Sequence, residues 1–187
     1  MNRKALLLVT IFAEGGLLAL ALILMRFSQL ELRSRIDISW SATVYAFLLC
    51  LPLLALLFFF DRSSWDPIAR FRREFDEKIA PIFTNSKLPD LALIALFAGV
   101  GEELFFRGWL QGVLTSKFEI WIGILLVSLI FGLMHYLSLT YAVYAFLTGL
   151  YLGVIYQASG NLYIVTAIHA LYDFVALVYL RAHSESS

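Results

Sequence analysis

The sequence predicts an all-α fold: a polytopic membrane helix bundle of about six transmembrane helices, with one amphipathic helix at the cytoplasmic interface. Of the 187 residues, 61% are hydrophobic, 16% are aromatic and only 15% are charged, which is far from the composition of a soluble domain. Six apolar runs are also present, and each approaches the roughly 20 residues that cross about 30 Å of hydrocarbon. These runs lie at 5–25, 40–60, 91–114, 121–136, 141–157 and 162–180.

The first two runs make up an N-terminal region, residues 1–60. The first run follows a short basic start, as a signal peptide would, but it is long and no small-x-small cleavage site follows. We therefore expect it to be retained as a helix. Glu14 lies inside this run and belongs to no motif, so two interpretations stay open: a protonated packing residue or a wall of a polar cavity. The second run opens at Trp40, a typical interface anchor, and contains Cys50, the single cysteine.

The segment 61–90 predicts an amphipathic helix over 66–79. Asp66 is a suitable cap for a helix whose first residue is Pro67. Apolar side chains recur on one face at Ile68, Phe71, Phe75 and Ile79, and basic ones fall mostly elsewhere, at Arg70, Arg72, Arg73 and Lys78. We expect this helix to lie on the cytoplasmic leaflet, with its aromatic face in the headgroup boundary and its bases near anionic lipid. The alternative is a solvated helix that packs on the bundle.

The last four runs, residues 91–180, predict a four-helix core, and residues 181–187 predict a disordered tail. With the N-terminus in the cytoplasm, nine Lys and Arg residues outside the runs lie on the cytoplasmic side and four on the other. This asymmetry predicts that both termini are cytoplasmic. The small size and minimal loops favour a bacterial or archaeal cytoplasmic membrane. Net charge is zero, and no basic, aromatic-interleaved surface indicates nucleic acid.

Ionisable residues inside the later runs predict a buried functional site. Glu102, Glu103 and Arg107 interrupt the third run, and the fourth run carries His135. Such groups cost several kcal/mol in hydrocarbon unless they face a protein interior or a wet cavity. At about 1.5 Å per residue, they and two polar residues of the last run converge in the inner half of the membrane. Residues four apart share a helix face, so Glu103 and Arg107 are expected to pair.

Three motifs then resemble a known family. They are Glu102-Glu103-x-x-x-Arg107, Phe131-x-x-x-His135 and His169-x-x-x-Asp173, each in a separate apolar run. In this order they are similar to the signature motifs of the CAAX protease and bacteriocin-processing (CPBP) family of intramembrane proteases, over about residues 91–180. The resemblance implies hydrolysis of a peptide bond near the membrane. It also implies which residues are catalytic, namely Glu102, His135, His169 and Asp173. The supporting residues that it implies are Glu103, Arg107 and Phe131.

The roles implied by the resemblance agree with the chemistry of these side chains. Glu102 is expected to be the general base, and His135 is expected to hold the attacking water. His169 is the oxyanion partner, while Asp173 fixes its tautomer or stabilises its cation. Glu103 and Arg107 form a structural pair without touching substrate. In some relatives the third motif ends in Asn, whose amide can donate a hydrogen bond to an oxyanion. In this chain it ends in Asp173, which cannot donate one when it is ionised.

Several alternatives stay open. Glu102, His135 and His169 are possible zinc ligands, but no compact zinc motif is present, so a metal-free mechanism without a cofactor is favoured. Possible substrates are prenylated C-terminal tetrapeptides, leader peptides and membrane-anchored C-terminal tails. A non-catalytic scaffold or bacteriocin-immunity-like protein, or a small ion carrier, would also bury polar groups. An ion carrier usually has broken helices or repeated halves, and neither is evident.

Overall fold

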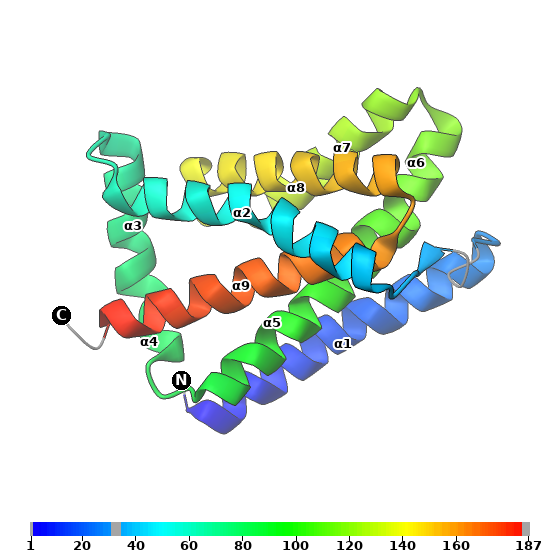
Figure 1. The fold of residues 1–187 in the computed structure, drawn as a ribbon. Coiled ribbons are helices and arrows are strands. Elements are labelled where there is room, and N and C mark those ends of the chain that lie inside the picture. Colours follow the sequence, from blue (N-terminus) through cyan, green and yellow to red (C-terminus); the bar gives the residue numbers. More distant parts are fainter. Residues whose placement is uncertain (1, 31–34, 185–187) are drawn as a thin grey trace.

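The computed structural model describes residues 2–30 and 35–184, and these residues are helical with short connections and without strands. The all-α prediction is confirmed. In chain order the helices are α1 (Arg3–Phe27), α2 (Trp40–Arg62), α3 (Asp66–Lys78), α4 (Ala80–Phe83), α5 (Leu88–Glu103), the π-helix η2 (Leu104–Gln111), α6 (Gly112–Lys117), α7 (Ile120–Met134), α8 (Leu139–Ser159) and α9 (Leu162–Ser184), as Figure 1 shows.

Each of the six apolar runs forms a helix, usually a few residues longer than predicted. The third run is part of a continuous helical segment formed by α5, η2 and α6, in which eight residues are π-helical. Within the described part of the chain, α1, α2, α8 and residues Leu162–Ala182 of α9 are each long and apolar enough to cross a membrane, and α7 is a shorter apolar helix. The chain is therefore a multi-pass helical membrane protein.

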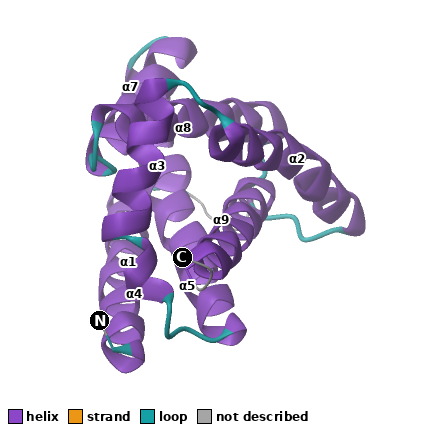
Figure 2. Ribbon diagram, turned by 90° about the vertical axis from the view of Figure 1, so that its left-hand side faces the viewer, coloured by secondary structure: helices purple, strands orange, loops and turns teal. Residues whose placement is uncertain are grey.

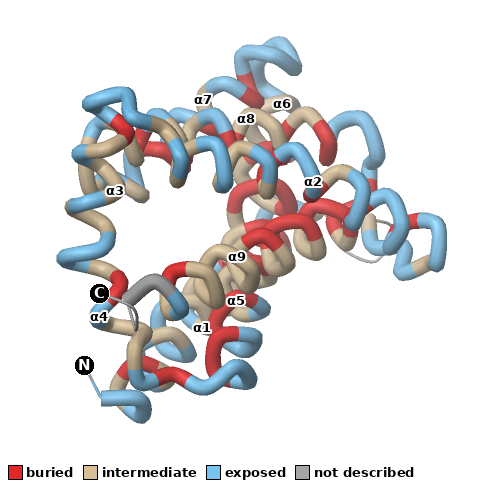
Figure 3. The backbone as a smooth tube through the Cα atoms, turned by 60° about the vertical axis from the view of Figure 1, so that its left-hand side comes forward, coloured by how far each residue is buried: buried red, intermediate tan, exposed pale blue. Residues whose placement is uncertain are grey.

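The outer faces of the bundle carry many large apolar side chains. Phe12 is 77% exposed, and Phe47 and Ile122 are exposed to about half their surface. Many of the buried positions instead lie on α5, α8 and α9, as Figure 3 shows. Contiguous apolar surface of this kind needs a cover, and lipid supplies it for a membrane protein.

Helix α3 differs from the prediction in two ways. Trp65 occupies the N-cap position and no side chain caps the helix, so the predicted Asp66 cap is wrong; Asp66 lies in the first turn, where its charge favours the helix dipole. Phe71 stacks on Tyr141 of α8 with ring centroids 5.4 Å apart, and Phe75 contacts the same ring. The aromatic face therefore packs on the bundle and not in the headgroup boundary, because Tyr141 offers it an apolar partner.

The start of α1 and the end of α9 lie at the same end of the bundle as α3 and α4 (Figures 1 and 2). At this end Arg3 pairs with Asp90, and Arg181 donates to the Ser86 carbonyl. Helix α9 continues to Ser184, into the segment 181–187 for which a disordered tail is predicted, and residues 185–187 lie outside the described residues.

Close contacts between backbones position the polar residues of α5. At Gly99, an added Cβ would lie 2.9 Å from the backbone nitrogen of Ala170 in α9, and at Gly101 it would lie 2.7 Å from the Glu14 carbonyl of α1. Any larger side chain would push these helices apart. The two glycines therefore let α1 and α9 approach α5 directly beside Glu102 and Glu103.

Candidate active site

The site begins where α5 becomes the π-helix η2. Glu102 and Glu103 end α5, and because successive helical residues point in different directions, their side chains face different surroundings. The Glu103 side chain is completely buried, whereas that of Glu102 is 13% exposed. π-helical turns within α-helices are frequent at functional sites. No feature of the sequence analysis predicted this one.

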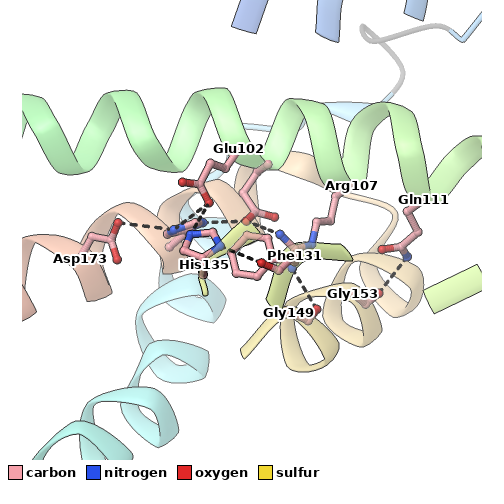
Figure 4. A network of polar contacts seen from close by, with 10 residues as sticks. Glu102, Arg107, Gln111, Phe131, His135, Gly149, Gly153 and Asp173 are labelled. Carbon is pink, nitrogen blue, oxygen red and sulfur yellow. Dashed lines mark hydrogen bonds and ion pairs between the residues drawn. The ribbon is translucent and has the colours of Figure 1, made fainter. Parts of the chain in front are cut away.

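Arg107 and Gln111 of η2 attach this segment to α8. Arg107 Nη2 donates to the Gly149 carbonyl at 2.9 Å, and Gln111 Nε2 donates to the Gly153 carbonyl at 3.0 Å (Figure 4). The two donors and the two acceptors are each four residues apart. Both donors are completely buried. The pair of contacts therefore sets the register between η2 and α8.

Glu103 is at the centre of the buried cluster. Its Oε1 accepts from Arg107 Nη1 at 2.6 Å, so the expected ion pair is present, and it also accepts from His169 Nδ1 at 2.7 Å. The guanidinium group of Arg107 lies over the ring of Phe131, 4.9 Å from its centroid. A buried carboxylate is tolerable when it is paired and hydrogen-bonded in this way. The cluster connects η2, α7 and α9.

His169 lies between three carboxylates. Its Nδ1 donates to Glu103, while its Nε2 lies 3.4 Å from Asp173 Oδ2 and 3.9 Å from Glu102 Oε2. Because Glu103 holds Nδ1, Glu103 orients this ring. The sequence analysis assigned that role to Asp173 and took Glu103 for part of a structural pair only. Asp173 instead faces the Nε2 side and is the more exposed of the two carboxylates, at 29%.

Glu102 and His135 face each other across a short gap. His135 follows the last residue of α7, and its Nδ1 lies 2.8 Å from the Phe131 carbonyl. A carbonyl only accepts, so Nδ1 carries the proton and Nε2 faces Glu102 Oε2 at 3.6 Å. The ring stacks on Phe131 with centroids 4.3 Å apart. Within the described residues, Glu102 Oε2 is buried without a hydrogen-bond partner.

These groups line a cavity of about 70 Å³, which is large enough to hold water. Glu102, His135, His169 and Asp173 share its wall with Leu53 of α2, so the N-terminal region contributes to it. A second cavity of about 140 Å³ adjoins it between α2, α3, α8 and α9, and its lining is mostly apolar. Two tyrosines, Tyr144 and Tyr172, line both cavities.

The structure brings all seven predicted site residues together, as Figure 4 shows for most of them. Sequence reasoning missed Tyr144, Thr148 and Tyr172, which also line the 70 Å³ cavity. The position of Tyr172, one turn after His169, was a usable signal. Glu14 is absent from the described lining of this cavity, and its carboxylate lies against Gly101 at the crossing of α1 and α5.

Comparison with known proteins agrees with the geometry. Residues 84–175 match the model of the family described as type II CAAX prenyl endopeptidase Rce1-like. The uncharacterized protein YpbD of Bacillus subtilis (strain 168) is 30% identical over 103 residues, which cover 54% of this chain and 50% of that relative. The chain thus spans about half the length of the curated relative it matches. No solved structure matches it. Through residues 84–175, which contain every polar side chain of the site described above, the chain belongs to the Rce1-like (CPBP) family of CAAX prenyl endopeptidases.

Proposed function

We propose that the protein is an intramembrane endopeptidase of the CAAX type, which hydrolyses a peptide bond near the membrane with a water molecule activated by Glu102. One observation carries the proposal: the free Glu102 Oε2 faces His135 Nε2 at 3.6 Å on the wall of a buried cavity. The match to the Rce1-like family supports a protease in general.

The gap between Glu102 and His135 suits one water molecule. Because Nδ1 of His135 carries the proton, Nε2 of the neutral ring is an acceptor, as is the carboxylate of Glu102. A water between them donates one hydrogen to each and directs an oxygen lone pair into the cavity. Glu102 takes one proton as this oxygen attacks the carbonyl carbon, and returns it to the amide nitrogen as the C–N bond breaks.

Glu103 and Arg107 act in this mechanism as positioning residues. Glu103 keeps a proton on Nδ1 of His169 and fixes the ring plane, while Arg107 compensates the charge of Glu103 inside the membrane. Asp173 lies on the Nε2 side of the same ring. Glu103 and Asp173 together flank the imidazole, and such an arrangement stabilises its cation as negative charge develops on the substrate.

We propose a reaction without a metal ion. Within the described residues, no group of three or more His, Cys, Asp or Glu side chains has an arrangement that could hold a metal ion. The Nδ1 atoms of His135 and His169 are engaged by Phe131 and Glu103. The zinc-dependent alternative, with Glu102, His135 and His169 as ligands, makes a different prediction that is tested below.

The proposed substrate is a membrane-associated peptide, either a prenylated C-terminal tetrapeptide, a leader peptide or a membrane-anchored tail. The proposed location is the cytoplasmic membrane with both termini in the cytoplasm. The start of α1, the end of α9 and the basic helix α3 lie at one end of the bundle, which supports this orientation, because Lys and Arg collect on the cytoplasmic side (Figure 1). Anionic lipid near residues 66–79 is part of the same proposal.

Purified protein in lipid nanodiscs tests the proposal with three quenched fluorescent peptides. The first carries an S-farnesylated cysteine as the fourth residue from its C-terminus. The second is a leader peptide, and the third ends in a membrane-anchored tail. Wild type is expected to cleave at least one, and Glu102→Gln is expected to lose ~10²–10⁴-fold in rate, because the amide cannot take the proton. Glu119→Gln, at an exposed position before α7, is the matched control and should keep full activity. Activity of Glu102→Gln within tenfold of wild type would overturn the assignment.

A further inference from the structure

The catalytic cavity needs a hydrogen-bond donor for the substrate carbonyl, and the motif residues do not supply a free one. Glu102 and Asp173 only accept when they are ionised. His135 has its Nδ1 proton on the Phe131 carbonyl, and His169 has its Nδ1 proton on Glu103. When His169 is a cation it also carries a proton on Nε2, but this atom faces the carboxylates of Glu102 and Asp173, which compete with the substrate for it. An oxyanion placed among these groups would meet mainly acceptors and negative charge.

Neutral hydroxyl groups on the same cavity wall can supply the missing hydrogen-bond donor. The hydroxyls of Tyr144 and Tyr172 are hydrogen-bonded to each other across α8 and α9. Two hydroxyls carry two protons, and their mutual bond uses one, so the second proton serves a partner outside the pair. Both side chains line the cavity that contains Glu102 and His169. The pair can therefore offer this cavity a donor that bears no charge.

The tyrosine pair also stands at the border between two cavities. Tyr144 and Tyr172 line the catalytic cavity of about 70 Å³ and the adjoining, mostly apolar cavity of about 140 Å³. A peptide that extends from the adjoining cavity towards Glu102 passes the two hydroxyls. The pair therefore lies on the route by which a peptide carbonyl would approach Glu102 and His135.

We propose that the Tyr144–Tyr172 pair donates the hydrogen bond that polarises the scissile carbonyl and stabilises the oxyanion. The inference rests on the proposed function and deepens it. The water oxygen bonds to the carbonyl carbon, its proton passes to Glu102, and the C=O electron pair moves to the oxygen, which accepts from the tyrosine hydroxyl. When the C–N bond breaks, that electron pair restores C=O and Glu102 delivers its proton to the leaving nitrogen. Neither hydroxyl gives up its proton.

The test is the double variant Tyr144→Phe/Tyr172→Phe in nanodiscs, assayed with the peptide that wild type cleaves fastest among the three above. Removing both hydroxyls keeps the ring volume and removes the two partners of their mutual hydrogen bond together, so the fold should persist. Loss of an oxyanion donor is expected to lower kcat by ~10²–10³-fold, while KM stays within about threefold. Tyr151→Phe is the matched control: this tyrosine is also on α8, but its hydroxyl donates to the Leu49 carbonyl outside the cavity. It should keep wild-type kcat.

A second measurement separates catalysis from structure. A phosphonamidate analogue of the cleaved peptide imitates the tetrahedral oxyanion, so its affinity should fall together with kcat in the double variant. If the tyrosines had only a structural role, the affinities for the analogue and for the substrate would change by the same factor. The single variant Tyr172→Phe should show part of the same loss if the double variant does not fold.

The outcomes distinguish the two proposals. A double variant with kcat within tenfold of wild type, beside an inactive Glu102→Gln, would overturn the tyrosine assignment and leave the proposed function standing. A loss seen in Thr148→Val but not in the double variant would also overturn it, because Thr148 Oγ1 is buried in the same wall and has no hydrogen-bond partner in the described structure. If wild type cleaves none of the peptides while its fold is intact, both proposals fail.

Discussion

Arg107 is a fully buried cation, and its surroundings explain why the membrane interior tolerates it. Its guanidinium group has a carboxylate partner in Glu103 at 2.6 Å and a carbonyl acceptor at Gly149. The rings of Phe131 and Phe106 lie within 4.9 and 5.9 Å of it and add attraction through their electron-rich faces. Removing one member of such a buried pair leaves the other charge without compensation.

We therefore expect Arg107→Ala and His169→Ala to fail in different ways. Arg107→Ala should lower the free energy of unfolding by about 3–5 kcal/mol, because Glu103 is left unpaired. His169→Ala should retain its fold better and lose turnover with little change in KM. Thermal unfolding in detergent and peptide cleavage measure the two effects. Arg26→Ala, at an exposed position near the end of α1, is the control. A stable but inactive Arg107→Ala beside an active His169→Ala would reverse the two roles.

At the scale of a helix, the π-helical segment η2 has the largest influence on the site. It begins directly after Glu103 and includes both side chains that bond to α8, Arg107 and Gln111. A π-helix is less favourable locally than an α-helix, so its contacts with α8 must compensate. Propensity along the sequence does not show such compensation, since the acceptors are carbonyls 42 residues further on.

The contact between the start of α1 and the start of α5 predicts a pH effect on stability. Asp90 precedes the apolar span, and the hydrogen bond from Arg3 followed by that from the Lys87 amide lowers the pKa of its carboxyl group to about 2. The ordinary value is about 3.9. Because the folded-state pKa is the lower one, this stabilisation is present above about pH 4 and is lost as the pH falls towards 2. Thermal unfolding between pH 6 and 2 should show the loss in wild type and a weaker one in Asp90→Asn. Equal pH dependence in both would contradict the assignment.

Helix α3 should respond to lipid charge through its basic residues. Its aromatic face is occupied by Tyr141, but Arg70, Arg73 and Lys78 are exposed. Each base near an anionic surface contributes about 1 kcal/mol. Amide hydrogen exchange over residues 66–78 should therefore slow several-fold in nanodiscs that contain anionic lipid, compared with zwitterionic ones. Changing the three bases to Gln should remove the difference, whereas Arg26→Gln should not. Identical exchange rates of wild-type α3 in both lipids would exclude the lipid contact.

At the scale of the whole molecule, the cavity depends on more than the family-related half. Leu53 of α2 lines the catalytic cavity, and α1 meets α5 at Gly101, directly before Glu102. The N-terminal helices thus form part of the wall and support of the site. The apolar outer faces of the same helices remain for lipid.

The proposed metal-free mechanism is tested on the whole protein. If Glu102 and His135 activate the water, exhaustive dialysis of the nanodisc protein against a chelator should change the cleavage rate by less than about twofold. Elemental analysis should then find less than about one transition metal per chain. A zinc mechanism predicts loss of activity, because the pKa of the water returns from about 7 towards 15.7 without the ion. Recovery of a chelated, inactive sample on addition of zinc would establish that alternative. A buffer with magnesium alone is the control.

The sequence by itself determined the class of fold, the six apolar helices and the seven polar and aromatic residues that meet at the site. It could do so because apolar length and intramembrane charge are local properties of the chain, and because three of its motifs resemble those of the CPBP family. Only the tertiary structure decided that Glu103 holds Nδ1 of His169, that α3 turns its aromatic face to Tyr141, and that two tyrosines border the catalytic cavity. The physical reason is common to all three. Each depends on which helix faces surround a side chain, and this is fixed by close backbone contacts such as those at Gly99 and Gly101 between segments far apart in sequence.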